Sequence, residues 1–229
     1  MVGRTATGNR RLSLLIQGFK DDFRFPVIAS ILVFINGCML LVSFEWPRGH
    51  IEAGWLNNWA ITPGKPAFPQ ILTYCFFHFH LPHFLGVSSL LLIAGAYGEW
   101  RYGEKMIIFF YVIGATVLAL LSIFLLEMLR YLVPSVILIQ WFSHGLNNRI
   151  VGSSAASFSV YGSIFPVVKP THRPVYFLGL VGAIISPIIL FQTVEVGDWV
   201  HLTVPFLALG VSWLIYRRKT VLFKLGHDQ

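Results

Sequence analysis

The stretch VGSSAASFSVYG, residues 151–162, is the most informative part of this chain for its fold. Glycine, serine and alanine at the start of an apolar segment allow close approach to neighbouring helices, as is common where membrane helices pack. Free N–H groups at a helix start can also stabilise a developing oxyanion, and Ser154 lies among them as a candidate nucleophile. The stretch therefore predicts a closely packed helix, and it leaves both packing and chemistry open as the reason for its small residues.

The composition identifies the chain as a membrane protein. Of its 229 residues, 55% are hydrophobic and 12% are charged, whereas soluble domains carry roughly 25% charged residues. The net charge of +7 does not indicate nucleic-acid binding, because the basic residues gather beside the apolar segments. Cys38 and Cys75 both lie inside apolar segments, so we interpret them as buried small side chains rather than as disulfide partners or metal ligands.

The apolar residues divide into segments of about the length of a membrane-spanning helix, which needs roughly 20 residues. We predict an all-α polytopic membrane protein with six transmembrane helices in one domain, residues 26–216. Residues 1–25 would form a cytoplasmic N-terminal segment and residues 217–229 a basic cytoplasmic tail. A further apolar stretch, residues 132–142, is shorter and contains Pro134, which favours a re-entrant or interfacial segment. The six predicted spans are residues 26–44, 70–97, 106–126, 151–168, 174–192 and 199–216.

Lysine and arginine indicate the orientation of these spans. With six spans both termini share one side, which then holds 13 of the 17 basic residues, against 4 on the other side. Because cytoplasmic loops of membrane proteins carry the excess of positive charge, both termini are expected in the cytoplasm. The second, fourth and sixth spans then begin at the external face, which places His78, His83, Ser154 and His201 at shallow depth near that face.

The N-terminal segment allows two interpretations. Residues 1–20 carry four basic residues and no acidic one, together with serine and threonine, as a mitochondrial targeting segment does. Asp21 and Asp22 weaken that interpretation, and we favour a short cytoplasmic amphipathic segment. We therefore expect a multi-pass protein of a bacterial inner membrane, with an organellar membrane as the alternative.

His201, in the stretch GDWVHLTVP, is an ionisable residue inside an apolar span. Such residues are rare in membranes and usually functional, although an interfacial histidine bonded to a neighbouring helix is an equal alternative. A neutral imidazole is well suited to take the proton from a serine hydroxyl. Asp198 could orient the ring, but we interpret Asp198 as the N-cap of this span.

His78, His80 and His83 form a dense histidine cluster. Imidazole is a common metal ligand, so a metal site is one interpretation. The spacing does not match HExxH, and no carboxylate lies within the cluster, so we predict no metal here. Oxyanion donation or structural hydrogen bonding at the external interface is the favoured role.

Taken together, four stretches resemble the rhomboid family of intramembrane serine proteases. FFHFHLPHFLG, residues 76–86, looks like the family's histidine motif of the second helix. GEWRYGEK, residues 98–105, resembles the charged turn that follows, although alone it indicates only a solvated loop. VGSSAASFSVYG is similar to the fourth-helix motif, and WVHLTVPFLALG, residues 199–210, to that of the sixth helix. The order and spacing of the four stretches are more specific than any one of them.

The resemblance implies a rhomboid-like bundle and acyl transfer by a Ser–His pair without a third, acidic member. Ser154 would be the nucleophile and His201 the base, with Phe158 stacked on the His201 ring. The backbone N–H groups of Ser153 and Ser154 and the side chain of His83 would hold the oxyanion. The resemblance implies no cofactor. The partners that it implies are the lipid bilayer and transmembrane protein substrates. Gly152 and His78 complete the predicted support of the site.

The chain departs from the family pattern at three positions. Val87 replaces the usual asparagine, which removes one oxyanion donor, a loss of about 3–4 kcal/mol in a serine hydrolase. Ala155 replaces the glycine after the nucleophile, and Val204 replaces a small residue of the sixth helix. Larger side chains there could separate the two helices, and a 1 Å misplacement can cost on the order of a hundredfold in rate.

Two functions are therefore weighed. The favoured one is an active endopeptidase that cuts membrane-anchored proteins near their external ends, because packing alone does not explain why both Ser154 and His201 match the family. The other is a catalytically inactive rhomboid-like protein that binds the transmembrane segments of clients. A histidine-lined transporter ranks third, since the third and fifth spans supply almost no ionisable group for a path near the midplane.

Overall fold

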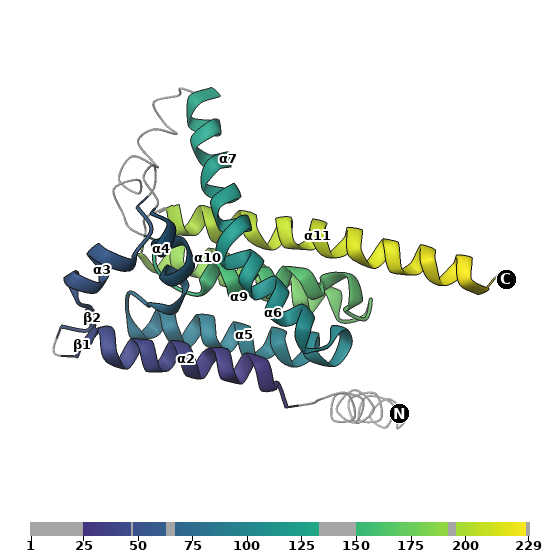
Figure 1. The fold of residues 1–229 in the computed structure, drawn as a ribbon, viewed down its shortest axis with the longest axis horizontal. Helices are drawn as coiled ribbons and strands as arrows, with labels where there is room; N and C mark the ends of the chain where they lie inside the picture. The colour runs from purple at the N-terminus through teal and green to yellow at the C-terminus, as the bar shows by residue number, and fades with distance from the viewer. Residues whose placement is uncertain (1–24, 47, 63–66, 133–149, 192–195, 228–229) are drawn as a thin grey trace, which may run out of the picture.

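The fold is that of a computed structural model, which describes residues 25–46, 48–62, 67–132, 150–191 and 196–227. The described chain is mostly helical, and α9 lies inside the bundle (Figure 1). Its elements are α2 (Val27–Ser43), β1 (Phe44–Glu45), β2 (His50–Ile51), α3 (Ala53–Trp59), α4 (Phe68–Thr73), the 3₁₀ turn η1 (Tyr74–Phe76), α5 (Leu81–Tyr102), α6 (Glu104–Ile113), the π-helical turn η2 (Gly114–Leu118), α7 (Ala119–Leu132), α9 (Ser154–Ile164), the 3₁₀ turn η3 (Phe165–Val167), α10 (Arg173–Phe191) and α11 (Val196–His227).

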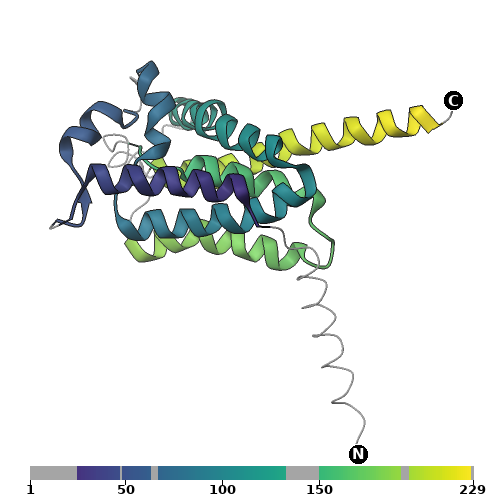
Figure 2. The ribbon, with the colours of Figure 1, turned by 60° about the horizontal axis from the view of Figure 1, so that its bottom comes forward.

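Helix α9 lies at the centre of the bundle. All its residues from Ser154 to Ile164 are buried, and it packs against α5, α6, η2 and α11. Because an apolar helix that is buried all round needs neighbours on every side, the serines and alanines of this segment face protein rather than lipid. Figures 1 and 2 show α5, α9 and α11 running in the same direction, so their first turns lie at one end of the bundle.

Glycines set how closely the other helices approach α9. A Cβ added at Gly162 would lie 2.1 Å from the carbonyl oxygen of Pro205, inside α11, so α9 and α11 touch through their backbones. At Gly114, the first residue of η2, a Cβ would lie 2.2 Å from the Cβ of Ser159 and 3.0 Å from the carbonyl oxygen of Ala155. These contacts explain the glycines at both places, since any side chain would separate the helices.

Polar side chains join the helices at the end of the bundle opposite to the first turns of α5, α9 and α11. Glu99 accepts a hydrogen bond from the N–H of Ala29 at 2.8 Å, so this residue of the charged turn braces the start of α2 and is not simply solvated as the sequence indicated. The Tyr102 hydroxyl contacts both the Ser163 carbonyl and the Ser212 hydroxyl, which ties α5 to α9 and α11. The rings of Tyr161 and Tyr176 stack 3.9 Å apart and link α9 to α10.

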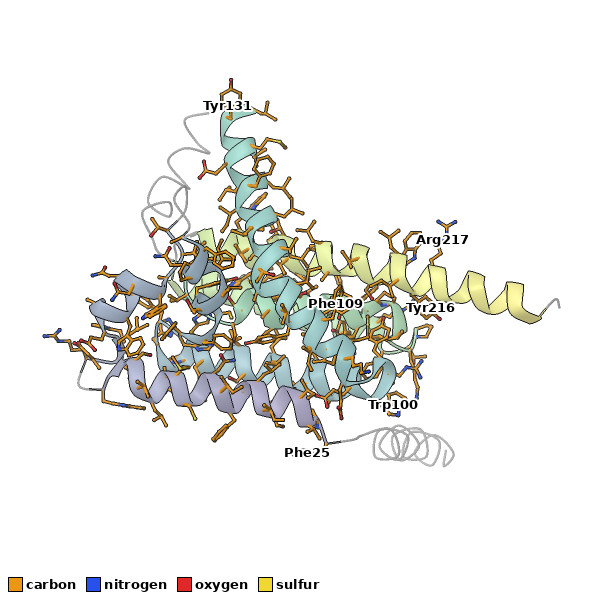
Figure 3. All side chains as sticks on the ribbon, viewed as in Figure 1. Phe25, Trp100, Phe109, Tyr131, Tyr216 and Arg217 are labelled. Atoms are coloured by element: carbon orange, nitrogen blue, oxygen red, sulfur yellow. The ribbon has the colours of Figure 1, made fainter. Side chains whose placement is uncertain are left out.

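The outside of the bundle is apolar, as a lipid environment requires. Large hydrophobic side chains point outward along α2, α6, α7, α10 and α11, among them Phe109, Tyr131 and Tyr216 in Figure 3. Soluble monomers rarely expose a contiguous apolar surface of this extent. The helical fold and this surface together agree with an integral membrane protein.

The predicted spans are matched in part. Among the described residues, three helical stretches are long and apolar enough to cross a membrane: Leu81–Tyr102, Glu104–Leu129 and Trp199–Arg217. Val27–Ser43 and Arg173–Ile185 are shorter apolar helices, and α9 has 11 residues.

Three details differ from the sequence-based expectation. The second span does not begin at residue 70: residues 68–76 form α4 and η1, and the long helix starts at Leu81, after the extended residue His80. The all-α prediction missed a small antiparallel pair, β1 with β2, in which Phe44 pairs with Ile51. The third difference is that α11 begins at Val196, so Asp198 lies inside the helix rather than at its N-cap. The predicted interfacial segment 132–142 lies outside the described residues beyond Leu132.

We expect Gly162→Ala to destabilise the protein by about 1–3 kcal/mol, as overpacking of a filled interior does. The added methyl group would meet the Pro205 carbonyl, and backbone atoms cannot move aside as a flexible side chain can. Gly210→Ala in α11 is the control, because a Cβ there has no heavy atom within 4 Å. Thermal unfolding in detergent measures both, and equal midpoints for the two variants would contradict the backbone contact between α9 and α11.

Candidate active site

The site is built on the chain that leads into α9. Ile150 pairs with Ile61 in an isolated β-bridge, and the N–H of Gly152 donates to the Tyr74 carbonyl at 3.0 Å. Gly152 has φ +116°, a backbone conformation that side chains disfavour, and a Cβ there would lie 2.6 Å from Cε1 of His83. A glycine is therefore required at 152 both for the turn and for the approach of the His83 ring.

Ser154 and Phe158 occupy the same face of α9. Ser154 is the first residue of the helix and is 5% exposed, and Phe158 follows one turn later. The Phe158 ring stacks on the His201 ring of α11, with centroids 4.9 Å apart and an interplanar angle of 27°. The stack fixes the plane of an ionisable ring beside the face that carries the serine.

His83 closes the site from the side of α5. The centroids of the His83 and His201 rings lie 6.3 Å apart. The backbone N–H of His83 donates to Nδ1 of His80 at 3.0 Å, and through this bond His80 caps α5. Nε2 of His83 is buried and has no hydrogen-bond partner within the described parts of the chain. A buried polar atom without a partner is costly, which is typical of a position that a ligand, water or reaction intermediate completes.

His78 lies just outside the long helix and supports the site from behind. It is fully buried, and its Nε2 lies 3.1 Å from the hydroxyl oxygen of Ser153. Its ring meets the edges of the His83 and Phe84 rings. Burial lowers the pKa of His78 to about 4, so its imidazole is neutral near pH 7.

Two residues of this site were missed by sequence reasoning. The Tyr111 side chain of α6 lies near that of Ser153, and its hydroxyl accepts a hydrogen bond from Nδ2 of Asn36 in α2 at 3.2 Å. The signal for Asn36 was present, because an amide in the middle of an apolar span needs a partner. Nothing in the sequence pattern singles out Tyr111.

The three histidines of the cluster make separate contacts. His80 caps α5, His83 faces Gly152, and His78 contacts Ser153. Across the residues that the structure describes, no three His, Cys, Asp or Glu side chains come together as a group that could hold a metal ion.

The positions that depart from the family pattern are accommodated within the core. Val87, Ala155 and Val204 are all buried, with exposed fractions of 6%, 1% and 0%. The backbones of α9 and α11 touch between Gly162 and Pro205, the residue next to Val204. Val87 supplies no polar group to the site.

These features define a class of protein: a helical membrane domain with a buried serine at a helix start beside a stacked histidine. The Rhomboid domain family model matches residues 65–224, more than half of the chain. The chain therefore belongs to the rhomboid family, which comprises intramembrane serine proteases and inactive relatives, and the resemblance seen in the sequence is confirmed. No curated protein sequence matches the chain.

Gly152→Ala is expected to lower stability more than Gly49→Ala. Both glycines have a positive φ, so both alanine variants pay the cost of a left-handed backbone, about 1–2 kcal/mol. Only at Gly152 would the methyl group also displace the His83 ring, because a Cβ at Gly49 has no heavy atom within 4 Å. The difference between the unfolding midpoints of the two variants isolates the His83 contact. Equal midpoints would show that His83 does not lie against Gly152.

Proposed function

We propose that this protein is an intramembrane serine endopeptidase that uses Ser154 as nucleophile and His201 as general base. One observation carries the proposal: His201 lies flat on Phe158, one helical turn after Ser154. Side chains of an α-helix tilt toward its N-terminus, so Phe158 holds the imidazole on the face and toward the end where Ser154 lies. A histidine that only packed against α9 would not need a buried serine at that place.

The reaction follows from these positions. The Ser154 hydroxyl attacks the scissile carbonyl while His201 takes its proton, and His201 then returns the proton to the leaving amine. Water hydrolyses the acyl-enzyme by the same proton transfers in the second half. No acidic third residue is needed in this scheme, because the stacked Phe158 ring orients the imidazole instead.

The oxyanion is held by the start of α9 and by His83. The backbone N–H groups of Ser153 and Ser154 lie at a helix start, where partial positive charge gathers. The buried Nε2 of His83, which has no partner among the described residues, supplies a further donor next to Gly152. With valine at position 87, His83 carries more of this task than it would beside an asparagine.

The six-span topology belongs to the same proposal. We assign α2, α5, α6 with η2 and α7, α9, α10 and α11 to the six spans of the membrane domain, residues 26–216, with α9 enclosed by protein. Segments 1–25 and 217–229 then lie in the cytoplasm, on the side favoured by the basic residues. The substrates are transmembrane proteins cut near the external face of a bacterial inner membrane, or of an organellar one.

The second candidate is an inactive relative that binds the transmembrane segments of client proteins. Val87 favours it, because this buried apolar side chain replaces the donor that the family pattern has there. Such a protein would keep the fold and the membrane-embedded surface and would lack turnover.

Labelling by a serine-directed fluorophosphonate distinguishes the two. We expect the purified wild-type protein to be labelled. In Ser154→Ala and in His201→Ala labelling should fall to background, a loss of at least about a hundredfold, because the nucleophile or its base is removed. The matched control is Ser157→Ala, which removes a fully buried hydroxyl from the same helix and should leave labelling unchanged. Folded wild-type protein that takes up no probe would instead support the inactive relative.

A further inference from the structure

His80 is the N-cap of α5, the helix that carries His83. The His80 backbone is extended, with φ −151° and ψ 161°, and its carbonyl accepts a bond from the N–H of Phe84 at 3.2 Å. Its Nδ1 accepts from the N–H of His83 at 3.0 Å. An N-cap side chain normally bonds to the second or third N–H of the helix. The second residue of α5 is Pro82, which has no N–H, so of these two positions only His83 can be capped.

The cap fixes the turn from which the His83 ring reaches the site. Helical side chains tilt toward the N-terminus, so the ring of a residue in the first turn lies over the helix start. The centroids of the His83 and His80 rings are accordingly 5.8 Å apart, and Cε1 of His83 would lie 2.6 Å from a Cβ at Gly152. The buried Nε2 of this ring is the proposed oxyanion donor. Fraying of the first turn of α5 therefore moves that donor away from Gly152.

The segment before the cap is held by contacts of its own. The carbonyl of Phe79 accepts from the N–H of Ile51, in β2, at 3.0 Å. Nε2 of the buried His78 lies 3.1 Å from the hydroxyl oxygen of Ser153. The cap bond joins this anchored segment to the first turn of α5.

Capping by an imidazole depends on protonation, unlike capping by serine or asparagine. Nδ1 of His80 can accept only without a proton, so the capped state is the neutral ring with its proton on Nε2. A second proton would point from Nδ1 at the N–H of His83 and would add positive charge where the helix dipole is already positive. The titratable groups that face His80 are His83, in α5, and His78, in the segment before it. Both are imidazoles, and neither offsets a positive charge on His80.

The capped state is the favoured one near neutral pH. Partial burial lowers the pKa of His80 below its ordinary value, which is about 6.5. A histidine whose pKa is lower in the folded state than in the unfolded state contributes stability that is fully present above about pH 6.5 and is lost as the pH falls below that value. Acid therefore charges His80 and breaks the cap.

We propose that His80 is a positioning residue for His83, and that its cap on α5 holds the oxyanion site together only while His80 is neutral. This inference rests on the proposed protease function. It adds a control by pH that a serine or an asparagine at the same position would not give.

The test compares three side chains at position 80 by the maximal rate of fluorophosphonate labelling. Asparagine caps a helix without titrating, whereas glutamine neither titrates nor is a favoured N-cap. At about pH 8 we expect wild type and His80→Asn to agree within about twofold, and His80→Gln to be about three- to tenfold slower, as the strength of an N-cap bond sets. As the pH falls toward about 5, the wild-type rate should approach that of His80→Gln, while His80→Asn stays faster than both.

Ratios between these proteins remove the effect of the base. His201 must be neutral to take a proton, so acid slows all three proteins, and it does so alike because His201 is unchanged. His50→Gln is the control for loss of a nearby histidine: His50 is exposed, and its Nδ1 lies 2.9 Å from the carbonyl of Ile51, its neighbour in β2. This variant should follow the wild-type profile. Equal rates of His80→Asn and His80→Gln at about pH 8, or a ratio of wild type to His80→Asn that does not change with pH, would overturn the proposal.

Crystal structures of the two His80 variants separate this inference from the protease proposal. If the wild-type protein is not labelled at all, the protease function fails, and the place of the His83 ring still decides the positioning role. A ring that lies against Gly152 in His80→Asn and is displaced in His80→Gln supports it. A ring in the same place in both variants overturns it.

Discussion

The structure depends on the close approach of backbones to α9. A helix enclosed by protein in a membrane gains little from the hydrophobic effect, since lipid tails are as apolar as leucine, and must be held by van der Waals contact and hydrogen bonds. Gly162 and Gly114 provide the contact, because both positions have space for a hydrogen atom and for nothing larger. The tyrosines at one end and the histidines at the other provide the hydrogen bonds and ring contacts.

Burial gives the polar groups of α9 a strength that they would not have in water. In a medium of low polarity each hydrogen bond is stronger and each unmet donor is more costly. At the end near Tyr102, the Tyr102 hydroxyl is hydrogen-bonded to the Ser163 carbonyl and to the Ser212 hydroxyl. At the end near Gly152, by contrast, Nε2 of His83 and Nδ1 of His78 are left without partners among the described residues. The two ends of one helix are thus treated unequally, which supports the site proposed at the Gly152 end.

The sequence predicted the parts of the fold that follow from local pattern. The apolar segments, a closely packed helix near Ser154 and the presence of an ionisable residue, His201, in an apolar helix could be predicted, because length, small residues and an ionisable group in an apolar run are local signals. The start of α5 was misplaced because residues 70–80 continue the apolar run of the span, although Pro82 in the first turn of α5 is a local signal for its start. Tyr111 could not be predicted, since its hydrogen-bond partner Asn36 is distant from it in sequence. The π-helical turn η2 begins at Gly114, where α9 approaches closely, and a contact of this kind is likewise not visible in a local pattern.

Pro205 gives the two helices of the site unequal stiffness. A proline has no N–H, so the turn of α11 from His201 to Pro205 lacks one of the bonds that make a helix rigid. The serine lies on a helix enclosed along its whole length, whereas the histidine lies on the turn of its helix with one bond fewer. The Gly162 contact stops that turn from shifting sideways without replacing the missing bond. In the proposed reaction one half of the pair is thus anchored, and the other keeps a small freedom to tilt while it takes a proton from the serine oxygen and passes it to the leaving nitrogen.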